Sequence, residues 1–439
     1  MGKEQLNAVN ARRRKTLAGF ASLTLVPWVN AWARDQTIQS NPLNVGSNTM
    51  PGNQMNGVPN MDGIRQLTFD DINGLSVRVL EAGYETPGRP AVLLLHGFPE
   101  TAYSWRKVMP ALAAAGYHVI APDQRGYGQT TGWDDRYDGD VSSFRTHAYA
   151  RDALGVVMAM GYRTVSAVVG HDFGAMVAAY CALVRPDVFR SLVLMSFPFD
   201  GPPSIPFNTL EKPAAPAHPS LDEQLAALPR PRMDSMTYFG TREANDNMQF
   251  SAQGLNNFLR AYYHVKSADW PENHPHALVS GSAQELATLP TYYIMDRGIG
   301  MAETVSPHMP TSLQIADNHW LTDSELAVYV NAFQRTGFQG GLNWFRCHTG
   351  AIGKSEIELF SGRTIDVPSC YIAGVADWGT YRKAGALDRM QTHTCTRMHG
   401  IHLVEDAGHW VQQEQPQRFT RLLLDFLQQS KGELSKETV

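Results

Sequence analysis

The 439-residue sequence predicts a mostly parallel α/β sheet that is flanked by helices and interrupted by a helical insertion. Apolar runs of strand length alternate with helical patterns up to about residue 200 and again after residue 350. Between these points, proline-rich loops and helical segments replace the alternation, with no convincing strand. A Gly-x-Asp-x-Gly turn at residues 170–174 joins a buried strand directly to a helix of small residues. Small residues on both sides relieve crowding at such a strained turn.

The bulk composition narrows the class of protein. The chain is 43% hydrophobic and 18% charged, as in ordinary globular proteins, and is long enough for one large domain with an insertion. A net charge of −5 argues against a nucleic-acid surface. The four cysteines lack metal-ligand spacing, and the sequence leaves open whether Cys347 pairs with Cys370 or Cys395 or whether the thiols are free.

The first 33 residues resemble a targeting segment. The basic run Arg12–Lys15 precedes a mildly apolar run over Leu17–Val26, and Ala31–Ala33 offers small residues for cleavage. Adjacent arginines before such a run indicate a twin-arginine signal, and the run is too short to span a bilayer. We expect an exported, periplasmic or secreted protein without stable membrane insertion. The alternative is a disordered basic tail on a cytoplasmic enzyme.

The first half of the predicted core begins after a linker or arm at residues 34–63, which is rich in Asn, Pro and Gly. Leu75–Leu80 alternates like a half-buried strand. Ala91–Leu95 is a continuous apolar run, typical of a strand buried on both faces of a parallel sheet. Val119–Ala121 is a further strand, and Phe144–Met160 has helical periodicity. We place the first part of the core at residues 64–200.

The second half of the core follows the insertion, which we place at residues 201–350 as a helical cap. Pro368–Gly374 resumes the strand–loop pattern, Ile401–Val404 repeats it, and Arg418–Gln428 is an amphipathic helix. We therefore assign residues 351–430 to the core and residues 431–439 to a tail. The inserted cap is placed where it covers the Gly-x-Asp-x-Gly turn.

Three residues in the predicted core form a candidate catalytic triad. Asp172 stands at the nucleophile position of the turn, Asp377 follows the strand that resumes after the insertion, and His409 follows the next strand. The order nucleophile, acid, histidine is that of the α/β-hydrolase fold. Each residue lies at the carboxyl end of a strand, where sites gather in open parallel sheets. Asp200, which follows an earlier strand, is the alternative acid.

Four motifs resemble those of epoxide hydrolases of the α/β-hydrolase fold, in the aspartate-nucleophile branch related to haloalkane and fluoroacetate dehalogenases. The similarity extends from about residue 65 to 428. It implies an oxyanion hole made by the backbone N–H groups of Phe98 and Phe173, and a helical cap between strands six and seven. The motifs are His96-Gly97-Phe98-Pro99-Glu100, Asp123-Gln124-Arg125-Gly126-Tyr127-Gly128, Gly170-His171-Asp172-Phe173-Gly174-Ala175 and Gly408-His409-Trp410.

The chemistry of an aspartate nucleophile supports the same branch. A carboxylate is already ionised at neutral pH and needs no base to attack. Its attack on an sp³ carbon leaves an alkyl ester on Asp172, which water activated by His409 can hydrolyse. A serine attacking the same carbon would leave an ether, which water does not cleave under these conditions. We therefore expect an epoxide or alkyl halide substrate and neither a metal nor an organic cofactor.

The residues beside the nucleophile favour epoxides over halides. Haloalkane dehalogenases hold halide with an indole N–H just after the nucleophile and a polar side chain after the His-Gly pair. Phe173 and Phe98 occupy these places and offer no such donor. Fluoroacetate dehalogenases place an arginine where Phe173 stands. Epoxide opening is the leading hypothesis. A dehalogenase of an alkyl halide or haloacid and a catalytically impaired, hydrolase-like binding protein are the alternatives.

The cap departs from the pattern that the resemblance implies, in which two tyrosines donate hydrogen bonds to the oxygen of the opening ring. Phe345 replaces the second tyrosine, and Ser235 stands at the first unless the register slips to Tyr238. Losing one such donor costs about 3 kcal/mol of transition-state stabilisation. Tyr103 and Tyr329 are further candidate donors. The predicted substrate pocket comprises Trp105, Ser235, Tyr238, Trp344 and Phe345, with packing as the alternative for both tryptophans.

A second group of cap aromatics is predicted to be structural. These residues are Tyr262, Tyr263, Tyr292 and Tyr293, whose hydroxyls we expect to reach water from the cap core. The expected partner of the protein is a small-molecule substrate, not a nucleic acid. The sequence leaves a homo-oligomer open.

Overall fold

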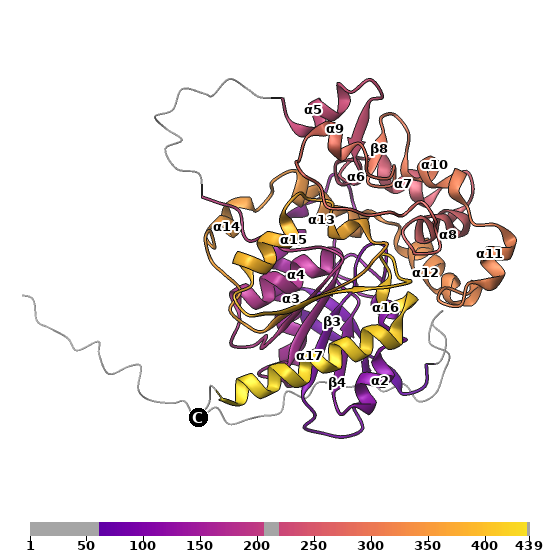
Figure 1. Ribbon diagram of the computed structural model, residues 1–439. Helices are drawn as coiled ribbons and strands as arrows, with labels where there is room; N and C mark the ends of the chain where they lie inside the picture. Colours follow the sequence, from indigo (N-terminus) through magenta and orange to yellow (C-terminus); the bar gives the residue numbers. More distant parts are fainter. Residues whose placement is uncertain (1–60, 206–218, 437–439) are drawn as a thin grey trace, which may run out of the picture. The chain divides into compact units, whose positions relative to one another are not determined.

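The structure is a computed structural model that describes residues 61–205 and 219–436 (Figure 1). The predicted signal segment, most of the linker at 34–63 and the end of the tail lie outside the described residues. An eight-stranded sheet has the order β1-β2-β4-β3-β5-β6-β9-β10. Its strands are β1 (Ile64–Ile72), β2 (Leu75–Ala82), β3 (Ala91–Leu95), β4 (His118–Pro122), β5 (Ala167–His171), β6 (Leu192–Met195), β9 (Ser369–Gly374) and β10 (Met398–Val404).

The sheet is mostly parallel, as predicted. Strand β2 pairs antiparallel with β1 and β4, and every other pairing is parallel. Strand β1 was not predicted. Its side chains are largely polar and only its two ends are buried, so its sequence lacks the apolar alternation of a half-buried strand. Antiparallel pairing with β2 holds this edge strand in place.

Both faces of the sheet are covered because its central strands are apolar throughout. On β3, Leu93 and Leu95 belong to one core cluster, while Val92 and Leu94 belong to a second. The first cluster contains residues of α3 (Thr146–Ala159) and α4 (Phe173–Val184), and the second contains residues of α2 (Met109–Ala114) and α17 (Pro416–Lys436). In Figure 1 the yellow helix α17 lies beside α2. The alternation along each strand therefore separates the two cores.

A helical cap is inserted between β6 and β9, the sixth and seventh strands of the sheet along the chain, as predicted (Figure 1). It also contains an unpredicted antiparallel pair, β7 (Arg232–Asp234) with β8 (Ile294–Asp296), whose three-residue strands are too short to show alternation. The helices of the insertion are α5 (Leu221–Ala226), α6 (Ser235–Phe239), α7 (Glu243–Gln249), α8 (Leu255–Val265), α9 (Ala283–Leu286), α10 (Met301–Val305), α11 (Ser312–Asp317), α12 (Asp323–Thr336), α13 (Gln339–Thr349) and α14 (Lys354–Glu358).

Two further features bear on the expectations from sequence. All four cysteines are buried and free, so Cys347 forms no disulfide with Cys370 or Cys395. Burial raises the pKa of each thiol. Among the described residues, no helix is long and apolar enough to cross a membrane.

Candidate active site

A sharp turn between β5 and α4 presents Asp172. Its φ of 53° and ψ of −124° place this non-glycine residue in a strained conformation. A Cβ on Gly170 would lie 2.1 Å from the carbonyl oxygen of Gly174, and a Cβ on Gly174 would lie 2.4 Å from that of His96. Both flanking positions therefore require glycine, which explains the Gly-x-Asp-x-Gly pattern.

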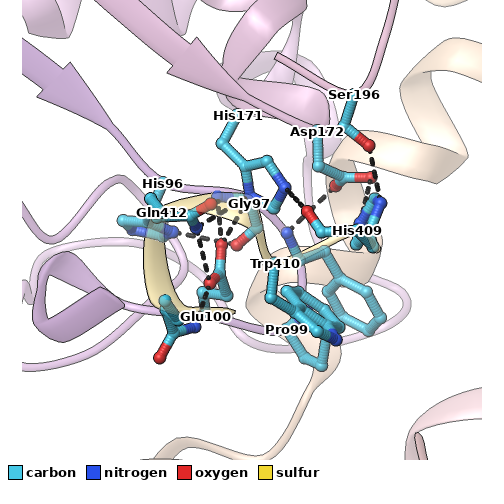
Figure 2. A network of polar contacts seen from close by, with 12 residues as sticks. His96, Gly97, Pro99, Glu100, His171, Asp172, Ser196, His409, Trp410 and Gln412 are labelled. Atoms are coloured by element: carbon cyan, nitrogen blue, oxygen red, sulfur yellow. Dashed lines mark hydrogen bonds and ion pairs between the residues drawn. The ribbon is translucent and has the colours of Figure 1, made fainter. Parts of the chain in front are cut away.

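His409 lies between Asp172 and the third predicted triad residue, Asp377, and Figure 2 shows its ring beside Asp172. Asp377 follows β9 and His409 follows β10, and both side chains are buried. The Nδ1 atom of His409 lies 3.1 Å from Asp377 Oδ1, and its Nε2 atom lies 3.5 Å from Asp172 Oδ2. Within the described part of the chain, Nε2 has no hydrogen-bond partner. The imidazole is therefore oriented by one carboxylate and directed at the other.

Ser196 joins this group and was not predicted. It follows β6 with a φ of 65°, and its Oγ lies 2.6 Å from His409 Nδ1 (Figure 2). The same hydroxyl donates to Asp377. Its position past the end of a strand was the available signal, but a single serine there matches no motif. The alternative acid, Asp200, instead forms an ion pair of 2.6 Å with Lys383. Asp377 is thus the carboxylate at the histidine.

One of the two predicted oxyanion donors contacts the nucleophile. The N–H of Phe98 donates to Asp172 Oδ1 at 3.0 Å. Phe173 is the first residue of α4, where a backbone N–H has no partner within the helix. A Cβ on Gly97 would lie 2.5 Å from the Cβ of Asp172, so the loop after β3 approaches the turn closely. One oxygen of the nucleophile is therefore held by a backbone amide, and the other faces the histidine.

A buried polar network supports the histidine loop (Figure 2). His171 Nδ1 lies 2.7 Å from Glu100 Oε2, and His171 Nε2 lies 2.8 Å from the carbonyl oxygen of His409. Both side chains are fully buried, and the Glu100 carboxylate also accepts from Gln412 and Gln413. Burial alone would lower the pKa of His171, but Glu100 outweighs it and the pKa is raised. His171 is thus a structural residue, whose ring is held at both nitrogens.

A second set of contacts ties the histidine loop to the cap. The N–H of His409 donates to the carbonyl oxygen of Lys266 at 2.8 Å. The carboxylate of Glu414 accepts from the N–H groups of Gly408 and Trp410 on the core side and from Ala268 on the cap side, at 2.8 to 2.9 Å. The backbone of the catalytic loop is therefore bonded to the end of α8.

Neighbouring charges and hydrogen bonds set the ionisation of the Asp172 and Asp377 carboxylates. Burial by itself raises the pKa of Asp172, but neighbouring imidazole and ammonium groups outweigh burial and hold this pKa below its usual range. These neighbours are His409, Lys266 and His171. Burial also raises the pKa of Asp377, but His409, Ser196 and the N–H of Gly379 outweigh it, so this pKa is lowered too. Both carboxylates are therefore ionised at neutral pH.

Aromatic rings form the wall above the nucleophile. The ring of Phe98 lies 5.1 Å from that of Phe239 and 5.3 Å from that of Phe345, between centroids. Trp344 lies 5.5 Å from Phe173. The structure thus places Trp344 and Phe345, two of the predicted pocket residues, against the oxyanion-hole residues. Phe345 brings an apolar ring to this wall and no hydroxyl.

The hydroxyls of two other predicted pocket residues contact cap or core residues outside the triad. Tyr238 Oη donates to Asn247 at 2.8 Å, so its hydroxyl is held inside the cap. Ser235 is buried beside Arg382, whose guanidinium also contacts Asp234. Neither residue contacts Asp172. Of the further candidate donors, Tyr329 donates its hydroxyl to Gln413, and the ring of Tyr103 packs against that of Tyr329.

The prediction that Trp105 lines the pocket is wrong. Its side chain is fully buried in the second core cluster, and its ring lies 6.2 Å from that of Phe419 in α17. Phe173 and the cap aromatics belong to the first cluster. Trp105 therefore serves packing, which was the alternative for this residue, because an apolar run does not reveal which face of the sheet a following side chain joins.

Lys266, the C-cap residue of α8, was not predicted as a site residue from the sequence. It is only 4% exposed, and its Nζ lies 4.6 Å from the ring centroid of Tyr293 and 5.3 Å from that of Tyr262. The available signal was spacing. Lys266 lies four residues after Tyr262 and three after Tyr263, so it shares their buried helix face. No group of three or more His, Cys, Asp or Glu residues in the described ranges is arranged to hold a metal ion.

Three comparisons place this chain among known proteins. Residues 90–289 match the family model described as the alpha/beta hydrolase fold. The chain is 33% identical to epoxide hydrolase A of Mycobacterium tuberculosis over 377 residues, which cover 81% of this chain and 95% of the relative. Epoxide hydrolase B of the same organism is 32% identical over 343 residues, which cover 77% of this chain and 91% of the relative. The solved structure of an epoxide hydrolase from an endophytic Streptomyces matches with a TM-score of 0.66 and 30% identity, covering 84% of this chain and 96% of that one.

Proposed function

Because the chain belongs to the epoxide hydrolase family of the α/β-hydrolase fold, we propose that it hydrolyses an epoxide through a covalent ester on Asp172. One observation carries the mechanism. The N–H of Phe98 holds Oδ1 of the Asp172 carboxylate, while Oδ2 lies 3.5 Å from the Nε2 of His409. A nucleophile held by an oxyanion donor and faced by a base is arranged for alkylation followed by ester hydrolysis.

The first step is attack of the Asp172 carboxylate on an epoxide carbon. The C–O bond of the ring breaks as the ester bond forms, and the epoxide oxygen becomes an alkoxide that takes up a proton. The carboxylate needs no base, since its lowered pKa keeps it ionised. The aromatic wall of Phe98, Phe239 and Phe345 fits an apolar substituent beside the ring.

The second step is hydrolysis of the Asp172 ester. His409 removes a proton from water, which attacks the carbonyl carbon of the ester. Asp377 and Ser196 hold the imidazole at Nδ1, so that Nε2 is the basic nitrogen. The N–H groups of Phe98 and Phe173 are placed to bind the oxyanion that forms on the former carboxylate oxygen. Collapse of the tetrahedral intermediate releases the diol.

Isotope labelling tests this mechanism. In a single turnover of styrene oxide in ¹⁸O-water, the oxygen that reaches the product comes from Asp172, and the solvent oxygen stays in the enzyme. Peptide mass spectrometry should therefore find label in the peptide that contains Asp172. Replacing His409 by Gln should instead leave the mass of the epoxide on that peptide, since alkylation needs no base but hydrolysis does. Label in the first-turnover product with an unlabelled Asp172 would show that the carboxylate acts only as a base.

We also propose that the protein is exported to the periplasm or secreted through a twin-arginine signal in residues 1–33. The support is the sequence pattern of Arg13 and Arg14 followed by an apolar run. Changing both arginines to lysine should leave an uncleaved protein inside the cell, as measured by fractionation and intact mass. Unchanged processing of that variant would contradict the proposal.

A further inference from the structure

A buried ammonium group of the cap lies beside the loop that carries the catalytic histidine. Lys266 Nζ lies among four aromatic rings, at 4.6 Å from the centroid of Tyr293, 5.3 Å from Tyr262 and 5.9 Å from both Tyr292 and Trp410. Trp410 is adjacent to the catalytic histidine. Such rings stabilise a cation through their π faces but cannot accept its protons as carboxylates do.

The ammonium lacks the direct partners that a buried charge normally has. Among the described residues, no carboxylate forms an ion pair with Lys266 Nζ and no atom accepts a hydrogen bond from it. The charged groups that act on it are Asp172, Asp377, Glu100 and Arg382, and Arg382 is itself paired with Asp234. The titratable rings around it are Tyr262, Tyr292 and Tyr293.

The two phenols that the resemblance implies as acids are absent. Phe345 and Ser235 stand in their places. Tyr262 and Tyr293 lie around Lys266, and burial raises the pKa of both phenols, so each is a weaker acid than an exposed tyrosine. An alkoxide must nevertheless be protonated when the ring opens.

We infer that the Lys266 ammonium is the acid that protonates the epoxide oxygen, a role that rests on the proposed function. When Asp172 attacks carbon, the electrons of the broken C–O bond move to oxygen, which takes one proton from Nζ. The step converts a carboxylate and an ammonium into a neutral ester and a neutral amine, with an alcohol on the substrate. No net charge is created in the buried site.

The proton returns to Lys266 during hydrolysis. The attacking water supplies two protons. One passes through His409 to the diol oxygen that leaves Asp172, and the other leaves the regenerated carboxyl group of Asp172 for the Lys266 amine. The resting pair of carboxylate and ammonium is then restored, and the sum of both steps is epoxide plus water giving diol.

Electrostatics make this acid stronger at the moment it is needed. Burial lowers the pKa of Lys266 to about 8, while the charges of Asp172 and Asp377 act to raise it. Esterification removes the charge of Asp172, so the pKa of Lys266 falls further as the alkoxide appears. The acidity of Lys266 is thereby coupled to the charge of Asp172.

The test measures alkylation alone, in a His409→Gln background where the ester accumulates. Styrene oxide is mixed with enzyme, and intact mass spectrometry follows the Asp172 adduct with time. Lys266→Met should slow alkylation by about 10²- to 10³-fold, the scale of general acid catalysis. Lys383→Met, which removes an ammonium paired with Asp200 at the surface, is the matched control and should leave the rate unchanged.

The pH profile separates proton donation from packing. The ammonium form is the donor, so the alkylation rate should be full below pH about 8 and fall as pH rises above it. The arginine in Lys266→Arg keeps the positive charge but does not release its proton in this pH range. The alkylation rate of this variant should therefore be low and independent of pH from about pH 7 to 10. Glu414, whose burial raises its pKa to about 8, titrates in the same range. If deprotonation of Glu414 caused the fall in alkylation rate at alkaline pH, the same fall would appear in Lys266→Arg.

The outcomes distinguish the two proposals. Absence of any adduct with Lys266 intact would contradict the proposed function itself. An adduct that forms equally fast in Lys266→Met, or an alkaline limb that survives in Lys266→Arg, would overturn the inference. A loss confined to Tyr262→Phe or Tyr293→Phe would also overturn it, because a phenol would then be the acid. If Lys266→Met does not fold, the pH profiles of alkylation with Lys266 intact and in Lys266→Arg still test whether Lys266 is the acid.

Discussion

The carboxyl edge of the sheet and the cap differ in how closely they follow the family pattern. At the sheet edge, Asp172, Asp377 and His409 lie where the motifs place them and meet one another. In the cap, Ser235 and Phe345 replace the expected tyrosines. Strand pairing fixes the first set, since β5, β6, β9 and β10 are neighbours in the sheet. The positions of the nucleophile, the histidine and its acid are therefore set by the topology of the sheet.

The cap has no comparable constraint. Its helices are held by aromatic packing such as that of Phe98 with Phe239 and Phe345. A donor that reaches the same space from another helix is geometrically equivalent for the substrate. The acid can therefore move between cap elements without disturbing the sheet, and we infer such a move from the tyrosine positions to Lys266 on α8.

The largest expected effect lies at the sheet edge. Asp377→Asn should lower kcat for styrene oxide by about 10³-fold, because an amide does not hold the histidine tautomer or stabilise its charged form. Asp200→Asn is the matched control and should retain full activity, since Asp200 pairs with Lys383 and not with His409. Steady-state kinetics decide, and a larger loss in Asp200→Asn would reverse the assignment of the acid.

A smaller effect at the same edge concerns the residue that the motifs do not include. Ser196→Ala removes one of two hydrogen-bond partners of His409 Nδ1 and should slow ester hydrolysis by about 10-fold, as expected for one buried hydrogen bond. Single-turnover kinetics separate this step from alkylation, which should not change. An unchanged hydrolysis rate would mean that Asp377 alone orients the imidazole.

In the cap, restoring a family residue should have a modest effect. Phe345→Tyr adds a hydroxyl to the aromatic wall and should raise alkylation by a few-fold, because Lys266 already supplies the proton. In the Lys266→Met variant, Phe345→Tyr should raise the alkylation rate by a larger factor than it does when Lys266 is present. Adduct formation in the His409→Gln background measures both. A fall in activity would show that the apolar wall is required by the substrate.

The smallest effect on activity is expected at Tyr238. Tyr238→Phe removes the hydroxyl that donates to Asn247 and should leave kcat within about two-fold, while lowering the free energy of unfolding by about 1 kcal/mol. Denaturant unfolding and steady-state kinetics measure the two quantities. A large loss of activity would place this hydroxyl in the site and restore the alternative register of the sequence comparison.

Much of the core could be predicted because its constraints are local. Gly170 and Gly174 flank Asp172 for a steric reason that the sequence displays, and buried parallel strands are continuous apolar runs. Strand β1 was missed because its burial is slight, and Trp105 was misplaced because the four-residue 3₁₀ helix Ala102–Trp105 is too short to show periodicity. A lone serine or lysine, such as Ser196 or Lys266, matches no motif. Its surroundings are made by segments far apart in the sequence.

The bond between the N–H of His409 and the carbonyl oxygen of Lys266 has a consequence for timing. Glu414 reinforces it by accepting from both Gly408 and Ala268. Any excursion of this end of α8 away from the sheet must break these bonds and disturb the base. Hydrolysis of the Asp172 ester would then stop until these bonds re-form.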